Sequence, residues 1–197
     1  EIAKALGVEL EIKDMKFAAL IEALKGGQID IIIADMHPTA EREKVVDFSL
    51  PYYAAYEMAV VTLKDKVSEF TSIESLHGKT IGVQLGTIQE DWAMKNLKGK
   101  SEIISYDRVY PEMVMALKRG DLDVIIVGDV IATVLTNKDA DLAVAMRLGS
   151  IAGAAVAVPQ GAEDLKYTVN KVIEDLVDSG KMSEIFESYR RMQPGVR

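Results

Sequence analysis

The segment ALKGGQIDIII at residues 23–33 recurs as ALKRGDLDVII at residues 116–126. Each copy ends a helix at a glycine, passes through a short acidic turn and enters a run of apolar, mostly β-branched residues. Continuous apolar runs of this kind are typical of strands that are buried on both faces of a parallel sheet. The repeat therefore predicts two similar units of α/β structure within one chain.

The residues in front of the two copies extend the repeat. Each copy follows a predicted helix, over residues 17–25 and 111–118, and each helix follows a predicted strand, over residues 9–12 and 102–106. A strand–helix–strand order that occurs twice is typical of right-handed βαβ units. The alternative is a chance match between two common α/β segments.

The second unit has a further strand and helix in front of its copy. The segment TIGVQLGT at residues 80–87 predicts a strand that runs into a turn, and residues 89–97 predict the helix that follows. In the first unit the corresponding helix falls on residues 1–6, and no strand precedes it in the sequence. We therefore expect the first unit, which we call lobe 1, to be N-terminally incomplete, by a segment on the order of 30 residues.

Two extended passages connect the repeated units. These passages are residues 45–61 and 151–158, and two helices are predicted after them, over residues 163–179 and 181–192. A chain that crosses to a second unit and then returns predicts an α/β fold of two lobes. The predicted domains are residues 1–54 (lobe 1), residues 55–151 (lobe 2) and residues 152–197 (the return to lobe 1, with the C-terminal helices).

Composition argues against several classes of function. The 31 acidic and 23 basic residues give a net charge of −8, which repels phosphates and argues against a nucleic-acid partner. There is no cysteine for disulfides or thiolate zinc sites, and His37 and His77 are too few for a multi-histidine metal site. No apolar run approaches the roughly 20 residues that a membrane-spanning helix needs. We expect neither a metal nor a cofactor.

A long motif in the first half of the chain resembles a known family. Residues 39–53 read TAEREKVVDFSLPYY, which resembles the stretch T-x-E-R-x-x-x-V-D-F-S-x-P-Y-Y of the solute-binding proteins (family 3) that bring polar amino acids to ABC importers. Supporting matches are LHGKTIGV at residues 76–83 and GKMSEI at residues 180–185. The resemblance implies the two-lobed type II periplasmic-binding-protein fold. In that fold each lobe is a mostly parallel sheet flanked by helices, two hinge strands join the lobes, and the ligand lies in the cleft between them.

The resemblance implies that Arg42 binds the α-carboxylate of the ligand. A guanidinium group suits this role because it gives two charge-assisted donors to a planar carboxylate. The alternative is a surface ion pair with Glu41 or Glu43. Thr87 and the backbone amide of Ile88 would join Arg42, since amide groups at the start of a helix attract anions. The family often has a second hydroxyl residue in place of Ile88, and Thr87 could instead serve only as a helix cap.

Asp129 matches the family's aspartate that accepts hydrogen bonds from the α-ammonium group. It follows the predicted strand 124–127, and the carboxyl ends of parallel strands are where ligands usually bind. The alternative is an N-cap for a helix that begins at Val130. Gln89 would reach the ligand side chain, and its alternative is a residue on the helix surface.

Three further residues of the first unit are candidates for contact with the ligand side chain. Phe17, at the head of a helix, matches an aromatic residue of the family, although an apolar helix face explains it equally well. Asp35 falls where the family usually has small residues, and a carboxylate there would pair with a cationic side chain. A solvated turn aspartate is the alternative. His37 belongs to the same loop.

The resemblance implies a protein that binds a free polar amino acid by lobe closure and delivers it to the membrane subunits of an ABC transporter, in the periplasm or outside the cell. Asp35 and the acidic balance favour a cationic ligand such as arginine or lysine, and glutamine stays open. No catalytic residue is expected. The alternatives are an amino-acid-sensing or degenerate interaction module, and a dehydratase of the prephenate or arogenate type. A strand-swapped homodimer is possible if the chain is complete as given.

Overall fold

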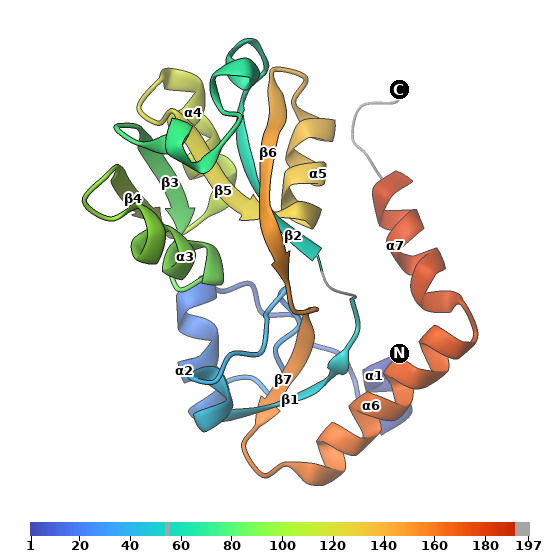
Figure 1. The fold of residues 1–197 in the computed structure, drawn as a ribbon. Coiled ribbons are helices and arrows are strands. Elements are labelled where there is room, and N and C mark those ends of the chain that lie inside the picture. Colours follow the sequence, from blue (N-terminus) through green and yellow to red (C-terminus); the bar gives the residue numbers. More distant parts are fainter. Residues whose placement is uncertain (54–55, 192–197) are drawn as a thin grey trace. The chain divides into compact units, whose positions relative to one another are not determined.

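The computed structural model describes residues 1–53 and 56–191, and it divides into two compact units. Among the described residues, unit 1 comprises residues 1–53 and 152–191, and unit 2 comprises residues 56–151 (Figure 1). The chain therefore passes from one unit to the other twice. The boundary expected between residues 54 and 55, and residues 192–197 of the returning segment, lie outside the described residues.

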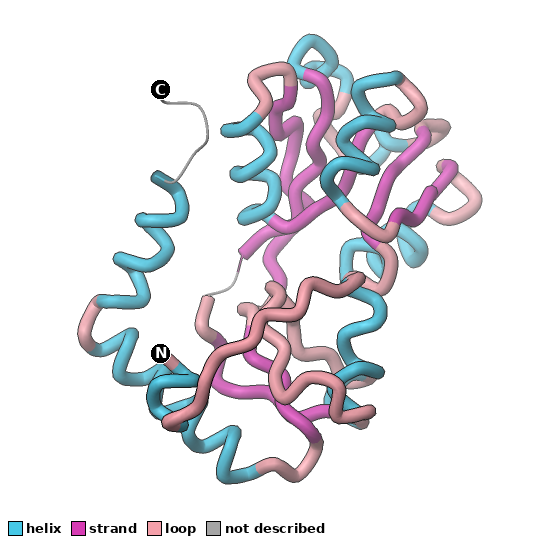
Figure 2. The backbone as a smooth tube through the Cα atoms, turned by 180° about the vertical axis from the view of Figure 1, so that it is seen from behind, coloured by secondary structure: helices cyan, strands magenta, loops and turns pink. Residues whose placement is uncertain are grey.

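Unit 2 is built on a five-stranded mixed sheet, in the order β4-β3-β5-β2-β6. Its strands are β2 (Tyr56–Leu63), β3 (Thr80–Gln84), β4 (Glu102–Tyr106), β5 (Val124–Gly128) and β6 (Leu142–Ile151). Strand β3 runs parallel to both of its neighbours, β4 and β5, whereas β2 pairs antiparallel with β5 and β6. Figure 2 shows these strands in magenta with helices around them. The strands predicted over residues 80–87 and 102–106 are confirmed.

Hydrophobic cores cover both faces of the unit 2 sheet. Its helices are α3 (Ile88–Leu97), α4 (Val114–Arg119) and α5 (Asp129–Lys138), with short helical turns at Lys64–Glu69, Ile73–Leu76 and Val109–Met113. Helices α4 and α5 pack against one face, on a cluster that contains Ile125, and α3 packs against the other, on a cluster that contains Ile126. All five residues of β5 are buried, as the continuous apolar run predicts.

Unit 1 contains an antiparallel pair of strands and four helices. The strands are β1 (Val46–Pro51) and β7 (Ala155–Pro159), and the helices are α1 (Ile2–Leu6), α2 (Leu20–Lys25), α6 (Glu163–Asp178) and α7 (Lys181–Arg191), with 3₁₀ turns at Phe17–Ala19 and Arg42–Lys44. One hydrophobic cluster joins Leu24 of α2 to Val46 of β1 and Ala157 of β7. A second joins Val158 of β7 to α6.

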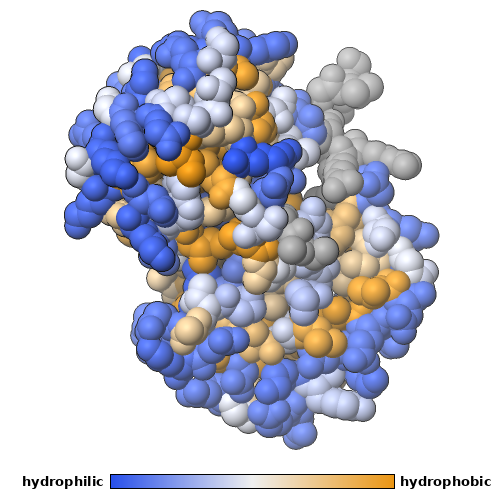
Figure 3. All heavy atoms as spheres, viewed as in Figure 1, coloured by the Kyte–Doolittle hydropathy of each residue, from blue (hydrophilic) through white to orange (hydrophobic). Residues whose placement is uncertain are grey.

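Hydrophilic residues dominate the visible surface. On the face shown in Figure 3 they cover much of both units, with apolar residues in patches among them. Within residues 1–53 and 56–191, no helix combines the length and hydropathy that crossing a bilayer requires.

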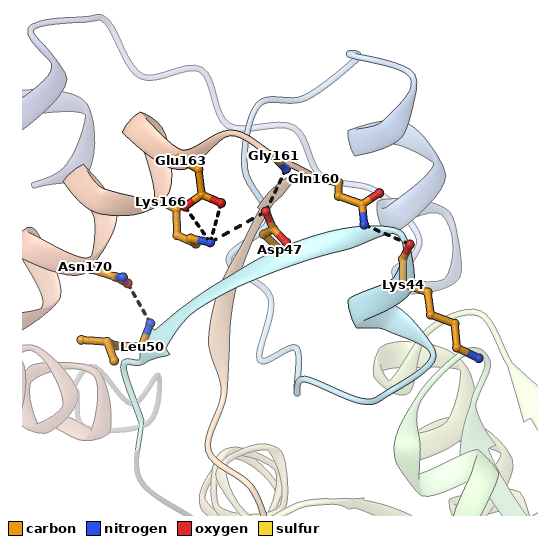
Figure 4. Close-up of polar contacts among 8 residues, drawn as sticks. All are labelled: Lys44, Asp47, Leu50, Gln160, Gly161, Glu163, Lys166 and Asn170. Atoms are coloured by element: carbon orange, nitrogen blue, oxygen red, sulfur yellow. Dashed lines mark hydrogen bonds and ion pairs between the residues drawn. The ribbon is translucent and has the colours of Figure 1, made fainter.

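The returning segment is fastened to β1 by polar contacts, which Figure 4 shows in close-up. The Asp47 carboxylate accepts a hydrogen bond from the Gly161 amide at 2.8 Å and lies 3.9 Å from the Lys166 ammonium group of α6. Farther along β1, the Leu50 amide donates to the Asn170 side chain of α6 at 2.8 Å. Asp47 therefore holds the turn between β7 and α6 against β1.

The strands predicted over residues 9–12 and 29–33 are not formed. In the second stretch only Ile32 pairs, through an isolated antiparallel bridge to Ala157, and in the first stretch Leu10 and Ile12 are 68% and 83% exposed. The reason is visible in unit 2, where β3 lies between β4 and β5 and hydrogen bonds to both. Within the described part of unit 1 no strand lies between the two corresponding stretches, so their backbones lack a ladder partner.

Candidate ligand-binding site

The Arg42 side chain is buried and oriented within unit 1. It belongs to the 3₁₀ turn Arg42–Lys44 and is only 9% exposed. Its Nη1 atom donates to the His37 carbonyl oxygen at 2.6 Å, and its guanidinium carbon lies 5.6 Å from the centre of the Phe17 ring, which is a cation–π distance. Glu41 pairs with Lys44 at 2.6 Å. The alternative interpretation, a surface ion pair of Arg42 with Glu41 or Glu43, does not fit a guanidinium group that is buried and held in this way.

His37 is a buried residue that ties the loop after residue 33 to the returning chain. It is 3% exposed, and its Nδ1 atom lies 2.7 Å from the Ala152 carbonyl oxygen. Burial lowers the pKa of His37 below its ordinary value, and the nearby Asp35 carboxylate opposes this effect. The imidazole is therefore neutral at physiological pH. Because a carbonyl oxygen can only accept, Nδ1 carries the proton.

Asp35 occupies a left-handed backbone conformation, with φ of 54°, directly after the apolar run. Its backbone amide donates to the Tyr52 hydroxyl at 3.1 Å. Burial raises the pKa of Tyr52 to about 12, with a further contribution from the negative charge of Asp35, so this phenol is neutral at physiological pH. Asp35 is half-buried, which differs from the fully solvated turn aspartate of the alternative interpretation.

Thr87 is the N-cap of α3 in unit 2. Its hydroxyl accepts a hydrogen bond from the Glu90 amide at 3.3 Å and donates to the Gln84 carbonyl at 2.7 Å, and the residue is 8% exposed. The Glu90 carboxylate in turn accepts from the Gly86 amide at 2.7 Å. These bonds fix the turn between β3 and α3, so that the amides of the first turn of α3, starting with Ile88, have a defined direction.

Gln89 is 7% exposed and is therefore not the helix-surface residue of the alternative interpretation. Asp129 is the first residue of α5, whereas the N-cap position belongs to Gly128, so the interpretation of Asp129 as an N-cap is wrong. The Asp129 carboxylate is half-buried, and its Oδ1 atom accepts a hydrogen bond from Nη1 of Arg147. Arg147 also lies 3.4 Å from Glu57.

The predicted site residues form one group in each unit. In unit 1, Phe17, His37 and Arg42 are in contact, and the charge of Asp35 acts on His37. In unit 2, Thr87 follows β3 and Asp129 follows β5, and these strands are parallel neighbours, so both residues lie at one edge of the sheet. Among the residues that the structure describes, no cluster of three or more histidine, cysteine or acidic side chains could hold a metal ion.

Sequence reasoning missed Arg147 and Glu57. They lie on two different strands, and their proximity follows from the antiparallel ladder in which Ala59 of β2 pairs with Arg147 of β6. Neither strand carries a sequence signal that points to its partner. A single sequence does not reveal the register of two antiparallel strands that are joined by a long connection.

Comparison with known proteins decides the family. Residues 1–192 match the family described as bacterial extracellular solute-binding proteins, family 3. The chain belongs to this family. The arginine-binding extracellular protein ArtP of Bacillus subtilis is 37% identical to it in an alignment of 193 residues that covers 94% of this chain and 74% of that protein. The L-cystine-binding protein TcyJ of Escherichia coli is 33% identical over 190 residues, which are 96% of this chain and 70% of that protein.

Solved structures of solute-binding proteins share the fold. The amino acid ABC transporter substrate-binding protein AbpA of Streptococcus pneumoniae, bound to L-arginine, superposes with a TM-score of 0.91 at 31% identity, over 96% of this chain and 80% of that one. An ancestral arginine-binding protein bound to arginine superposes with a TM-score of 0.85 at 35% identity, over 95% and 83% of the two chains. The predicted α/β class, the type II periplasmic-binding-protein fold, is confirmed. The expectation of a mostly parallel sheet in each lobe is wrong, because β2 and β6 join the unit 2 sheet antiparallel and the described strands of unit 1 form an antiparallel pair.

Proposed function

We propose that this solute-binding protein binds a free polar amino acid, with arginine or lysine favoured, outside the cytoplasm and delivers it to the membrane subunits of an ABC transporter. It acts by binding alone and leaves the ligand chemically unchanged. The observation that carries the proposal is the position of Arg42. A guanidinium group that is buried on Phe17 and hydrogen-bonded to the His37 carbonyl is already oriented to receive a carboxylate.

Both charges of an amino acid zwitterion have a counterpart among the site residues. Arg42 binds the α-carboxylate, together with Thr87 and the Ile88 amide at the start of α3, where the helix dipole favours an anion. Asp129 accepts from the α-ammonium group. The resemblance to solute-binding proteins implies that a ligand stabilises the closed form of such a protein, because it forms more bonds there.

Asp35 supports the preference for a cationic side chain. Its carboxylate lies close enough to His37 to raise the pKa of that imidazole against the effect of burial, so its charge is effective in the loop that holds Arg42. Phe17 and Gln89 would contact the aliphatic and polar parts of the ligand side chain. Among the relatives, the names of ArtP and TcyJ specify arginine and L-cystine, and the AbpA structure contains L-arginine.

A thermal-shift screen of the free amino acids and L-cystine tests the function. Arginine or lysine should raise the melting temperature most, because a ligand that binds only the folded state stabilises it by mass action. Asp35→Asn should lower affinity for arginine about tenfold more than affinity for glutamine. Asp30→Asn, at an exposed position of the same segment, is the matched control and should change neither affinity. If no amino acid raises the melting temperature, the proposal is wrong.

A further inference from the structure

Arg147 lies between two carboxylates at the edge of unit 2 that carries Asp129. Strand β2 runs between β5 and β6, with Met58 paired to Gly128 on one side and Ala59 paired to Arg147 on the other. This register places Asp129, which directly follows Gly128, within reach of the Arg147 side chain. The Arg147 guanidinium donates to Asp129 and lies 3.4 Å from the Glu57 carboxylate of β2.

The two contacts of Arg147 are unequal. The contact with Asp129 is a direct hydrogen bond to a carboxylate that is 29% exposed, whereas Glu57 is more distant and 42% exposed. The hydrogen bond to Asp129 is also the main reason that the pKa of Arg147 is raised, with Glu57 contributing least. Both pairs are partly open to water, where ion pairs are weak, so exchanging one partner for the other costs little.

We propose that Arg147 competes with the α-ammonium group of the ligand for Asp129, and that Glu57 receives Arg147 when the ligand displaces it. The proposal rests on the proposed function, in which Asp129 accepts from that ammonium group. A guanidinium group on Oδ1 uses part of the acceptor capacity of the carboxylate and places a like charge beside the incoming ammonium group. Glu57 lowers the cost of displacement because it offers a second carboxylate on the adjacent strand.

This exchange makes Arg147 and Glu57 determinants of affinity, although neither needs to touch the ligand. Removing Arg147 should strengthen the binding of a ligand that has an α-ammonium group, and leave unchanged the binding of an analogue that lacks one. Removing the charge of Glu57 should weaken binding only while Arg147 is present, since Glu57 acts through Arg147. A purely structural role of the ion pair predicts the opposite sign for Arg147, because Asp129 would then lose the group that orients it.

Calorimetric titration with L-arginine and with 5-guanidinopentanoate, which is arginine without its α-amino group, tests the proposal. The variants are Arg147→Met, Glu57→Gln and the double variant. Arg119→Met is the matched control, because Arg119 is an exposed arginine of unit 2 that pairs with Asp121 at 2.7 Å. For L-arginine, Arg147→Met should bind about fivefold more tightly, Glu57→Gln about threefold more weakly, and the double variant like Arg147→Met. Arg119→Met should bind as the parent does, and 5-guanidinopentanoate should not distinguish Arg147→Met from the parent.

The outcomes separate this inference from the proposed function. Weaker binding of L-arginine by Arg147→Met, or a Glu57→Gln effect that persists in the double variant, overturns the exchange and leaves the function intact. A parent protein that binds no free amino acid overturns the proposed function, and the exchange with it.

Discussion

Residues 29–33 of unit 1 and residues 122–126 of unit 2 occupy equivalent places in the internal repeat, yet they form different structures. The second stretch leads into β5, which is hydrogen-bonded to β3 on one side and to β2 on the other. The first stretch makes one bridge, from Ile32 to Ala157, and leaves Ile33 55% exposed, whereas the equivalent Ile126 is 1% exposed. Nearly identical local sequences thus differ in structure because a strand requires neighbours on the sheet.

The rest of unit 1 follows the order of unit 2 closely. In unit 2, β5 is followed across the sheet by β2 and then β6, both antiparallel to their neighbours. In unit 1, Ile32 is followed by β7 and then β1, again antiparallel. Residues 9–12 form no strand, and the Lys13 side chain next to them donates to the Gln28 carbonyl at 3.0 Å. Within the described residues, no strand occupies the position that corresponds to β3, and the stretches that correspond to β4 and β5, residues 9–12 and 29–33, form no strand either.

Hydrogen exchange should show the largest contrast between the two units. Amides of residues 124–126 should exchange at least about 1000-fold more slowly than amides of residues 31 and 33, because only the former belong to a ladder with partners on both sides. Mass spectrometry of peptic fragments or NMR measures the difference. Equal protection of the two stretches would contradict this account of unit 1.

Light scattering on the same sample separates two explanations of any protection that is found in unit 1. A strand-swapped homodimer would have twice the mass of the chain and would protect residues 31 and 33 through its partner. A protected monomer would show instead that unit 1 closes its own sheet.

Matched truncations at Ile126 and Ile33 should differ strongly in their effect on the free energy of unfolding. Ile126→Ala removes a side chain from the core of unit 2 and should cost about 2–5 kcal/mol. Ile33→Ala removes a side chain that is mostly in water and should change stability by no more than about 0.5 kcal/mol. Urea denaturation measures both. Similar costs would mean that Ile33 is as well packed as its counterpart.

A smaller effect concerns the pH dependence of unit 1. The pKa of His37 is lowered from its ordinary value of 6.5, so the folded state favours the neutral imidazole. The stability that this contributes is fully present above pH 6.5 and is lost as the pH falls from 6.5 toward the lowered pKa. Thermal unfolding at a series of pH values should show this loss, and His37→Gln should reduce it. His77→Gln, at an exposed position, should retain it.

Local signals in the sequence predicted the elements whose causes are local. The helix predicted over residues 111–118 is α4, which starts only at Val114 and ends at Arg119, with Gly120 as its C-cap at a φ of 82°. Helix α3 begins at Ile88, directly after Thr87, whose hydroxyl caps the helix. The strands over residues 9–12 and 29–33 failed because their formation depends on a neighbour, which apolar periodicity does not reveal.

The candidate site also contains both features with local causes and features that depend on distant parts of the chain. Arg42 lies in one continuous motif, and Thr87 lies in one continuous turn. Both residues were identified from these stretches, and both are buried and held by hydrogen bonds. The contact of Arg42 with Phe17 and that of Asp129 with Arg147 join residues far apart in the chain. Such contacts depend on tertiary packing and on strand register, so they could not be read from residue types alone.

Calorimetric titration of L-arginine into the parent protein, Arg42→Met and Asp129→Asn tests most directly whether these two residues hold the zwitterion. Each substitution should weaken binding by at least about 30-fold, because it removes the counterpart of one charge of the zwitterion. Arg42→Lys is a further variant, which keeps the positive charge. Circular dichroism checks that each variant is folded. Arg119→Met and Asp121→Asn, which alter an exposed ion pair of unit 2, should bind as the parent does. Folded Arg42→Met and Asp129→Asn variants that bind arginine with the affinity of the parent would contradict the account.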